Sequence, residues 1–211
     1  MLSIIQAAGW PIWPLILCSV AAMALVIERA VALRRRRVAP AGLVDEVMQV
    51  LRQGMPSADV LGKLAANSVL GQLLATGIRA AALDGRTVNE TLLRDAFESA
   101  GRAAAHQLDR YLNALATIAS AAPLLGLLGT VIGMIEIFGS QAPTGGTNPA
   151  LLAHGISVAL YNTAFGLIVA IPSLMFHRYF RGRVNDYLHD MEQGAERVMH
   201  LLLARPAKSR G

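Results

Sequence analysis

Residues 114–138, ALATIASAAPLLGLLGTVIGMIEIF, contain a single ionisable side chain, Glu136. An α-helix needs about 20 residues to cross a bilayer core, and its backbone polar groups are paired within the segment. The stretch therefore predicts a membrane-spanning helix. Residues 10–27 and 156–176 are equally apolar and carry no charged residue. Together the three runs predict an all-α membrane protein with three transmembrane helices.

The placement of positive charge predicts the orientation of these spans. All 19 Lys and Arg residues lie within 29–110 or 178–210. Basic segments are retained on the cytoplasmic side, so we expect the N-terminus outside and the C-terminus inside. In chain order we expect an outer N-terminus with the first span (1–28), a cytoplasmic helical domain (29–113), the second span (114–138), an outer loop (139–155), the third span (156–176) and a cytoplasmic helical C-terminus (177–211).

Two spans should continue into the cytoplasm as long helices. Thr87-Val88-Asn89-Glu90 has the form of a capping box, which predicts a helix start. Only a kink at Pro123 interrupts the pattern before Phe138, so one helix of about 50 residues is expected. The third span should continue on an apolar stripe. That stripe is Val184, Leu188, Met191, Ala195, Val198 and Leu202, and a second one in the cytoplasmic domain is Leu70, Leu73, Leu74, Ile78 and Ala81.

The N-terminus has a competing interpretation as a cleaved signal peptide, because Ala22-Met23-Ala24 resembles a cleavage site. A signal peptide needs basic residues before its apolar run, whereas here they follow it. They form a block of four, Arg34, Arg35, Arg36 and Arg37. Directly after a span, such a block predicts a topology anchor in contact with anionic lipid. We discount nucleic acid as a partner.

Cofactor and enzyme chemistry find little support in the sequence. Cys18 is the only cysteine, which excludes an intrachain disulfide, and the five histidines lack metal-ligand spacing. No nucleophile with a base, phosphate-binding loop or metal cluster is recognisable. We expect no metal, no cofactor and no enzymatic activity.

Polar groups inside the apolar runs are the candidate functional residues: Thr130, Asn162, Thr163 and Glu136. A membrane threonine usually bonds a carbonyl of its own preceding turn, which is the structural alternative for each hydroxyl. An intramembrane carboxylate is costly and tends to face a cavity or partner. For Glu136 the alternative is snorkelling to the outer interface. Small residues nearby, including Gly126, Gly129 and Gly133, predict close helix packing.

Two motifs together resemble a known family. GLLGTVIGM at 126–134, followed by GISVALYNTAFGLIVAIP at 155–172, is similar to the paired signature of the MotA/TolQ/ExbB proton channel family, closest to ExbB and TolQ. The first span ending in Ile27-Glu28-Arg29 extends the likeness to nearly the whole chain. The resemblance implies a homopentamer in the bacterial inner membrane, around the single-span helices of an ExbD-like or TolR-like partner whose membrane aspartate carries protons. It also implies a TonB-like or TolA-like protein as a further partner.

Within this resemblance, Thr130 and Thr163 match the pore-lining threonines, and one position departs. ExbB and TolQ usually carry a glutamate where this chain has Val158. Glu136 lies six residues outward of Thr130, and Val158 lies five outward of Thr163. If the two threonines lie at the same depth in the membrane, Glu136 supplies a carboxylate near the depth of Val158, where the family's glutamate is missing. Asn162 stands where smaller or aliphatic residues are usual, so the pore lining is expected to differ in detail.

We therefore expect the channel-forming subunit of a motor, or stator, driven by the proton-motive force. Small-residue stripes and long amphipathic extensions leave faces that one protomer cannot bury, which predicts a homo-oligomer. One alternative is a scaffold that assembles without conducting, which the loss of the glutamate at Val158 makes conceivable. The other is a small-solute secondary transporter. Three spans with one clear membrane carboxylate provide few groups from which a solute-binding site could be built. A neighbouring reading frame encoding a single span with an aspartate would favour the motor.

Overall fold

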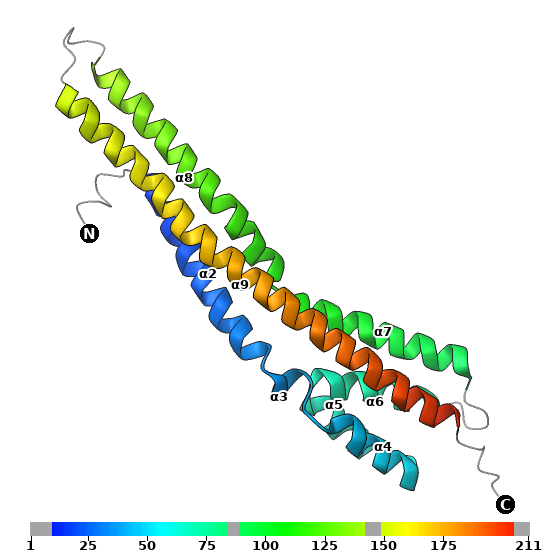
Figure 1. The fold of residues 1–211 in the computed structure, drawn as a ribbon. Coiled ribbons are helices and arrows are strands. Elements are labelled where there is room, and N and C mark those ends of the chain that lie inside the picture. The colour runs from blue at the N-terminus through cyan, green and yellow to red at the C-terminus, as the bar shows by residue number, and fades with distance from the viewer. Residues whose placement is uncertain (1–9, 84–88, 142–148, 205–211) are drawn as a thin grey trace, which may run out of the picture. The chain divides into compact units, whose positions relative to one another are not determined.

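The computed structural model describes residues 10–83, 89–141 and 149–204, and the regular secondary structure of these residues is helical throughout (Figure 1). The helices are α2 (Ile12–Ala32), α3 (Arg35–Val38), α4 (Leu43–Gln53), α5 (Ala58–Asn67), α6 (Val69–Leu83), α7 (Glu90–Asp109), α8 (Leu112–Gln141) and α9 (Pro149–Leu203). The chain folds into two compact units. The first, here called the span unit, comprises residues 1–29 and 111–179, and the second, the extension unit, comprises 30–110 and 180–211.

Three stretches of helix in the described residues are long and apolar enough to cross a membrane. They are Ile12–Ala32 and stretches within Glu90–Gly139 and Leu152–Leu203. The expectation of an all-α chain with three candidate spans is therefore confirmed by helix length and composition. Each of the second and third stretches contains one internal proline, Pro123 in α8 and Pro172 in α9, and both helices continue through it.

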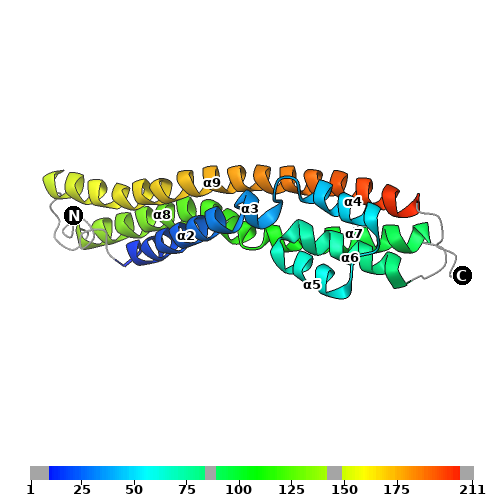
Figure 2. The ribbon, with the colours of Figure 1, turned by 90° about the horizontal axis from the view of Figure 1, so that it is seen from below.

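In the span unit, α8 and α9 run side by side, and α2 packs against the pair (Figure 1; Figure 2). Leu15 of α2 forms a buried cluster with Ala122 of α8 and Ala170 of α9. Leu125, Phe165 and Val169 surround that cluster. The first span is thus held where α8 and α9 expose small side chains.

The prediction of one uninterrupted helix from the capping box to Phe138 is wrong. α7 ends at Asp109 and α8 begins at Leu112. Arg110 between them is extended, with ψ of 134°, and Tyr111 is left-handed, with φ of 65°. A non-glycine residue in the left-handed region costs about 1–2 kcal/mol. The sequence contains no glycine or proline there, so its pattern gives no sign of the break.

Two helix starts also differ from expectation. The N-cap of α7 is Asn89, whose side chain accepts a hydrogen bond from the Thr91 amide at 3.0 Å. Thr87, the cap predicted from the sequence, lies outside the described residues. α9 begins at Pro149, well inside the predicted outer loop, because a proline suits the first turn of a helix where no amide donor is needed.

The extension unit is a helical bundle built on the predicted stripes. Leu70, Leu73, Leu74, Ile78 and Ala81 of α6 are buried, as are Val184, Met191, Val198 and Leu202 of α9. Two ion pairs fasten this part of α9: Arg197 to Asp45 of α4 at 2.6 Å and Arg181 to Asp109 of α7 at 2.7 Å. The Tyr187 hydroxyl also donates to the Leu33 carbonyl at 2.9 Å. The α6 stripe and these four residues of the α9 stripe are therefore confirmed as core, whereas Leu188 and Ala195 of the α9 stripe are half-buried.

Candidate functional site: the α8–α9 seam

The contact between α8 and α9, here called the seam, is built from residues with little or no side chain. A Cβ atom on Gly126 would lie 2.7 Å from the Asn162 carbonyl oxygen, and one on Gly166 would lie 2.6 Å from the Ala122 carbonyl oxygen. Both neighbours are backbone atoms, which cannot move aside. The predicted close packing of small residues is therefore confirmed, and it lies between two helices of the same protomer.

The seam brings the two predicted threonines into direct contact. The hydroxyls of Thr130 and Thr163 are hydrogen-bonded to each other. Thr130 also lies 3.1 Å from the Gly126 carbonyl and 3.3 Å from the Ala159 carbonyl, while Thr163 lies 3.3 Å from the Gly126 carbonyl. The two threonines therefore lie at the same depth along the helix pair, which is the condition assumed in comparing the depths of Glu136 and Val158.

This hydroxyl pair has spare hydrogen-bonding capacity. Each hydroxyl has one proton to donate and two lone pairs to accept with. In the pair, the protons are directed at a neighbouring hydroxyl or carbonyl, so lone pairs remain for a further donor. Both side chains are only half-buried in the protomer. The pair can therefore order a water molecule or accept a hydrogen bond from a protonated acid, and it cannot itself titrate near neutral pH.

Asn162 lies inside the seam. Its exposed fraction is 2%, and a Cβ on Gly129 would meet its side chain at 2.8 Å. The missing side chain of Gly129 makes the space that the Asn162 amide fills. Seen from the isolated protomer, Asn162 is thus a packing residue next to the threonine pair, and its predicted place in a pore lining stays a prediction.

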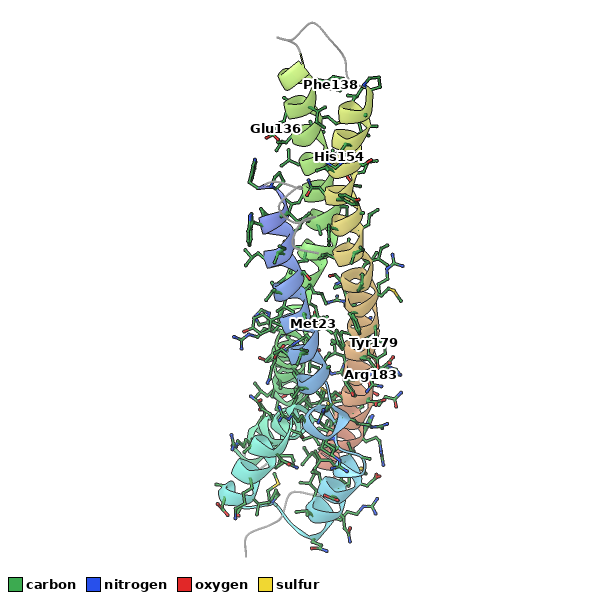
Figure 3. All side chains as sticks on the ribbon, turned by 90° about the vertical axis from the view of Figure 1, so that its left-hand side faces the viewer. Met23, Glu136, Phe138, His154, Tyr179 and Arg183 are labelled. Carbon is green, nitrogen blue, oxygen red and sulfur yellow. The ribbon has the colours of Figure 1, made fainter. Side chains whose placement is uncertain are left out.

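Glu136 and Val158 occupy different surroundings. Glu136 is exposed and points to the side of α8 that does not face α9 (Figure 3), whereas Val158 is half-buried. A Cβ on Gly133 would approach Ala159, and one on Gly155 would approach Ile137, which fixes how the helices are aligned. In that alignment Glu136 lies about two residues, or roughly 3 Å, outward of Val158.

One polar cluster of the span unit was not predicted. Arg29 at the inner end of α2 is 5% exposed, and it donates to both carboxylate oxygens of Glu28, at 2.5 Å and 2.6 Å. Its guanidinium lies over the Tyr111 ring, 5.3 Å from the centroid. The motif Ile27-Glu28-Arg29 marked the end of the span in the sequence, but the ring that Arg29 meets is far away along the chain.

Metal-binding chemistry finds no support in this geometry. Among the described residues, no three His, Cys, Asp or Glu side chains are grouped closely enough to hold an ion. Cys18, a free thiol, is half-buried in α2. What the site offers chemically is therefore the pair of hydroxyls, set in apolar helices.

A helix pair long and apolar enough to cross a membrane, with small residues at its contact and a hydroxyl pair within it, indicates a multi-pass helical membrane protein. Residues 65–193 match the model of the MotA/TolQ/ExbB proton channel family. The match spans α8, the second candidate span, and the membrane part of α9. The chain belongs to this family.

Two curated relatives are similar over most of the chain. A putative biopolymer transport protein ExbB-like 3 of Synechocystis is 37% identical over 83% of this chain and 82% of its own length. Biopolymer transport protein exbB1 of Vibrio cholerae is 33% identical over 80% of this chain and 74% of its own length. A shorter match, 41% identical over 41% of this chain, is to ExbB of Aquifex aeolicus. These relatives are named as transport proteins, and the family is one of proton channels.

The seam generates a first prediction. Gly126→Ala should destabilise the chain in detergent micelles by about 1–3 kcal/mol, because the added methyl meets the Asn162 backbone. Gly139→Ala is the matched control on the same helix, since a Cβ there has nothing within 4 Å. Unfolding of both variants is followed by circular dichroism. Equal midpoints for Gly126→Ala and Gly139→Ala would show that the helices are not held at this distance.

Proposed function

We propose that this chain is the channel-forming subunit of a motor driven by the proton-motive force in the bacterial inner membrane. Its N-terminus would lie in the periplasm and its C-terminus in the cytoplasm, as the distribution of Lys and Arg favours. The observation that carries the proposal is the contact between the hydroxyls of Thr130 and Thr163 within apolar helices of a family member.

The threonine pair would act by hydrogen bonding and not by titration. A proton entering from the periplasm is carried by a carboxyl group, either the membrane aspartate of a partner or Glu136. The hydroxyls orient that carboxyl group, or a water beside it, as the proton is exchanged. Each proton that crosses 100 mV releases about 2.3 kcal/mol, which is enough to bias a conformational step.

The proposed assembly is a homo-oligomer, a pentamer by the resemblance, around an ExbD-like or TolR-like subunit with a single span. The relatives are named as ExbB biopolymer transport proteins, which favours energising a TonB-dependent or Tol-dependent process at the outer membrane. A TonB-like or TolA-like protein would receive the force. Arg34, Arg35, Arg36 and Arg37 are all exposed and would contact anionic lipid headgroups.

A non-conducting scaffold is the second candidate, and Val158 is the observation that favours it. The usual carboxylate is missing at this position of α9, and Glu136 in the protomer points away from that helix. A scaffold would need the seam and the assembly, but it would not need hydroxyl groups at positions 130 and 163. Proton flux through the parent chain, and its loss in variants that remove only the hydroxyls, therefore distinguish the channel from the scaffold.

The oligomer is tested by native mass spectrometry of the full chain in detergent. We expect a single homo-oligomer, with five copies as the predicted number. Exposed side chains on the span helices include Glu136 and Tyr161, and polar groups of this kind are costly against lipid. A stable monomer at all detergent concentrations would end the channel proposal.

The hydroxyls are tested by Thr130→Val and Thr163→Val, which replace a hydroxyl with a methyl at nearly constant volume. Both variants should assemble as the wild type does. In liposomes carrying the chain with its single-span partner and a pH-sensitive dye, each should lower proton flux at least about tenfold, as loss of hydrogen bonds worth about 1.5 kcal/mol would. Ser120→Ala, which removes an exposed hydroxyl of α8, is the control. Full flux in both threonine variants would make the pair purely structural and end its proposed role, whereas a parent chain that assembles with its partner and shows no flux would favour the scaffold.

The relocated carboxyl is tested separately. Glu136→Gln keeps the shape of the side chain and removes its titration, and Val158→Glu restores the family's usual residue. If Glu136 takes the role of the glutamate that is missing at Val158, Glu136→Gln abolishes proton-dependent flux, and the double variant regains part of that flux. A Glu136→Gln variant as active as the parent from pH 6 to pH 8, roughly the range that spans neutral conditions, would identify Glu136 as an interfacial side chain.

A further inference from the structure

The cluster of Glu28, Arg29 and Tyr111, here called the clamp, joins two places where the chain crosses the boundary of the span unit. The chain leaves this unit after Arg29 and re-enters it at Tyr111. Residues 30–110 lie between them along the chain. No covalent connection shorter than that segment holds the inner end of α2 to the beginning of α8. The guanidinium over the Tyr111 ring, 5.3 Å from its centroid, is a direct contact between the two.

The geometry of the clamp is unusual for neighbouring residues of a helix. Side chains at positions i and i+1 do not face each other on a helix surface. Glu28 nevertheless accepts two hydrogen bonds from Arg29, at 2.5 Å and 2.6 Å. This bidentate pairing neutralises a guanidinium that is 5% exposed and fixes its plane. A fixed guanidinium keeps its positive charge over the Tyr111 ring.

Tyr111 is held in a conformation that its own chemistry disfavours. Among the described residues it is the non-glycine residue with positive φ, at 65°. Its carbonyl accepts the hydrogen bond from the Leu115 amide, 3.1 Å away, in the first turn of α8. The clamp therefore acts on the residue that sets the direction in which α8 begins.

The first turn of α8 and the threonine pair share one face of the helix. Leu112 and Thr130 are separated by 18 residues, which is about five turns. Leu115 and Gly133 have the same separation and so the same relation. Leu112 and Leu115 are fully buried, while Thr130 and Gly133 lie in the seam. A rotation of α8 at Tyr111 would be carried along the helix and turn Thr130 away from Thr163.

We propose that Arg29 and Tyr111 are positioning residues that set the rotation of α8, and with it the contact between Thr130 and Thr163. The inference rests on the proposed function only where it concerns proton flux. Its structural part, the alignment of α8 on α9, is measurable without any activity.

The structural test uses a disulfide as a probe of the seam. With Cys18→Ser as background, Gly133→Cys and Ala159→Cys place two thiols where the Cβ atoms would be 3.1 Å apart. This is slightly shorter than the roughly 3.5–4.5 Å of a disulfide, so a small outward shift of the helices allows the bridge. Oxidative cross-linking within the full-length protomer is timed on non-reducing gels and by peptide mass. Tyr111→Leu removes the cation–π contact, and Arg29→Lys removes the planar fork that Glu28 holds against the ring. Each should slow cross-linking about threefold or more, the factor that loss of a cation–π contact at a partly exposed ring implies.

Three controls separate positioning from general damage. Tyr111→Phe keeps the ring face and should cross-link at the wild-type rate. The exchange Glu28→Arg with Arg29→Glu keeps both charges but moves the guanidinium off the buried face, so it should behave as Tyr111→Leu does. If Tyr111→Leu loses its helical circular dichroism signal, the cross-linking rate of Arg29→Lys is used in its place to test the proposal. Wild-type rates in both Arg29→Lys and the exchanged pair would overturn the proposal.

The functional part is tested with Thr130→Val. If the clamp acts through the threonine pair, Tyr111→Leu should lower proton flux in the parent and lower it no further in the Thr130→Val variant. Independent, additive losses would show that the clamp supports the fold without positioning the threonines. A wild-type chain without flux would contradict the proposed function, and the cross-linking result would still judge the clamp.

Discussion

The distance between α8 and α9 is the constraint on which the rest of the span unit depends. Within lipid no hydrophobic force drives helices together, so their contact relies on packing and hydrogen bonds. Glycine at Gly126 and Gly166 lets backbone meet backbone, and any side chain there would strike a carbonyl oxygen. The same closeness brings the Gly126 carbonyl within reach of both threonine hydroxyls. The close packing of the helices and the hydrogen bonding of the threonines therefore depend on the same glycine contact.

A consequence is that the polar groups of the seam are uncharged: two threonine hydroxyls that bond to each other and the buried amide of Asn162. From Leu112 to Phe176 the chain has one carboxyl side chain, Glu136, and one imidazole, His154, and neither is buried in the seam (Figure 3). The seam thus offers hydroxyl groups for hydrogen bonding but has no acid or base of its own that could hold a proton. An exchangeable acid has to come from elsewhere, which is why the proposed mechanism needs a second subunit or an oligomer that brings Glu136 inward.

Sequence patterns predicted what depends on local composition. Apolar length predicted the spans, small residues at helical spacing predicted the seam, and the stripes from Leu70 and from Val184 predicted buried faces. Three features were not predicted from the sequence, because they depend on residues that are distant along the chain. The left-handed Tyr111 lies in a run without glycine, Asn162 is buried because Gly129 on another helix leaves room, and Arg29 is buried because a ring enters from beyond residue 110.

The strain at Tyr111 also shows why the clamp and the seam belong together. A left-handed tyrosine costs about 1–2 kcal/mol, whereas a cation–π contact at a partly exposed ring contributes about 0.5–1 kcal/mol. The contact with Arg29 offsets part of the strain and not all of it. The remainder must be carried by the packing of Leu112 and Leu115, both fully buried in the first turn. Since that buried face continues into Gly133 and Thr130, the break before α8 persists only as long as the helix keeps the rotation that closes the seam.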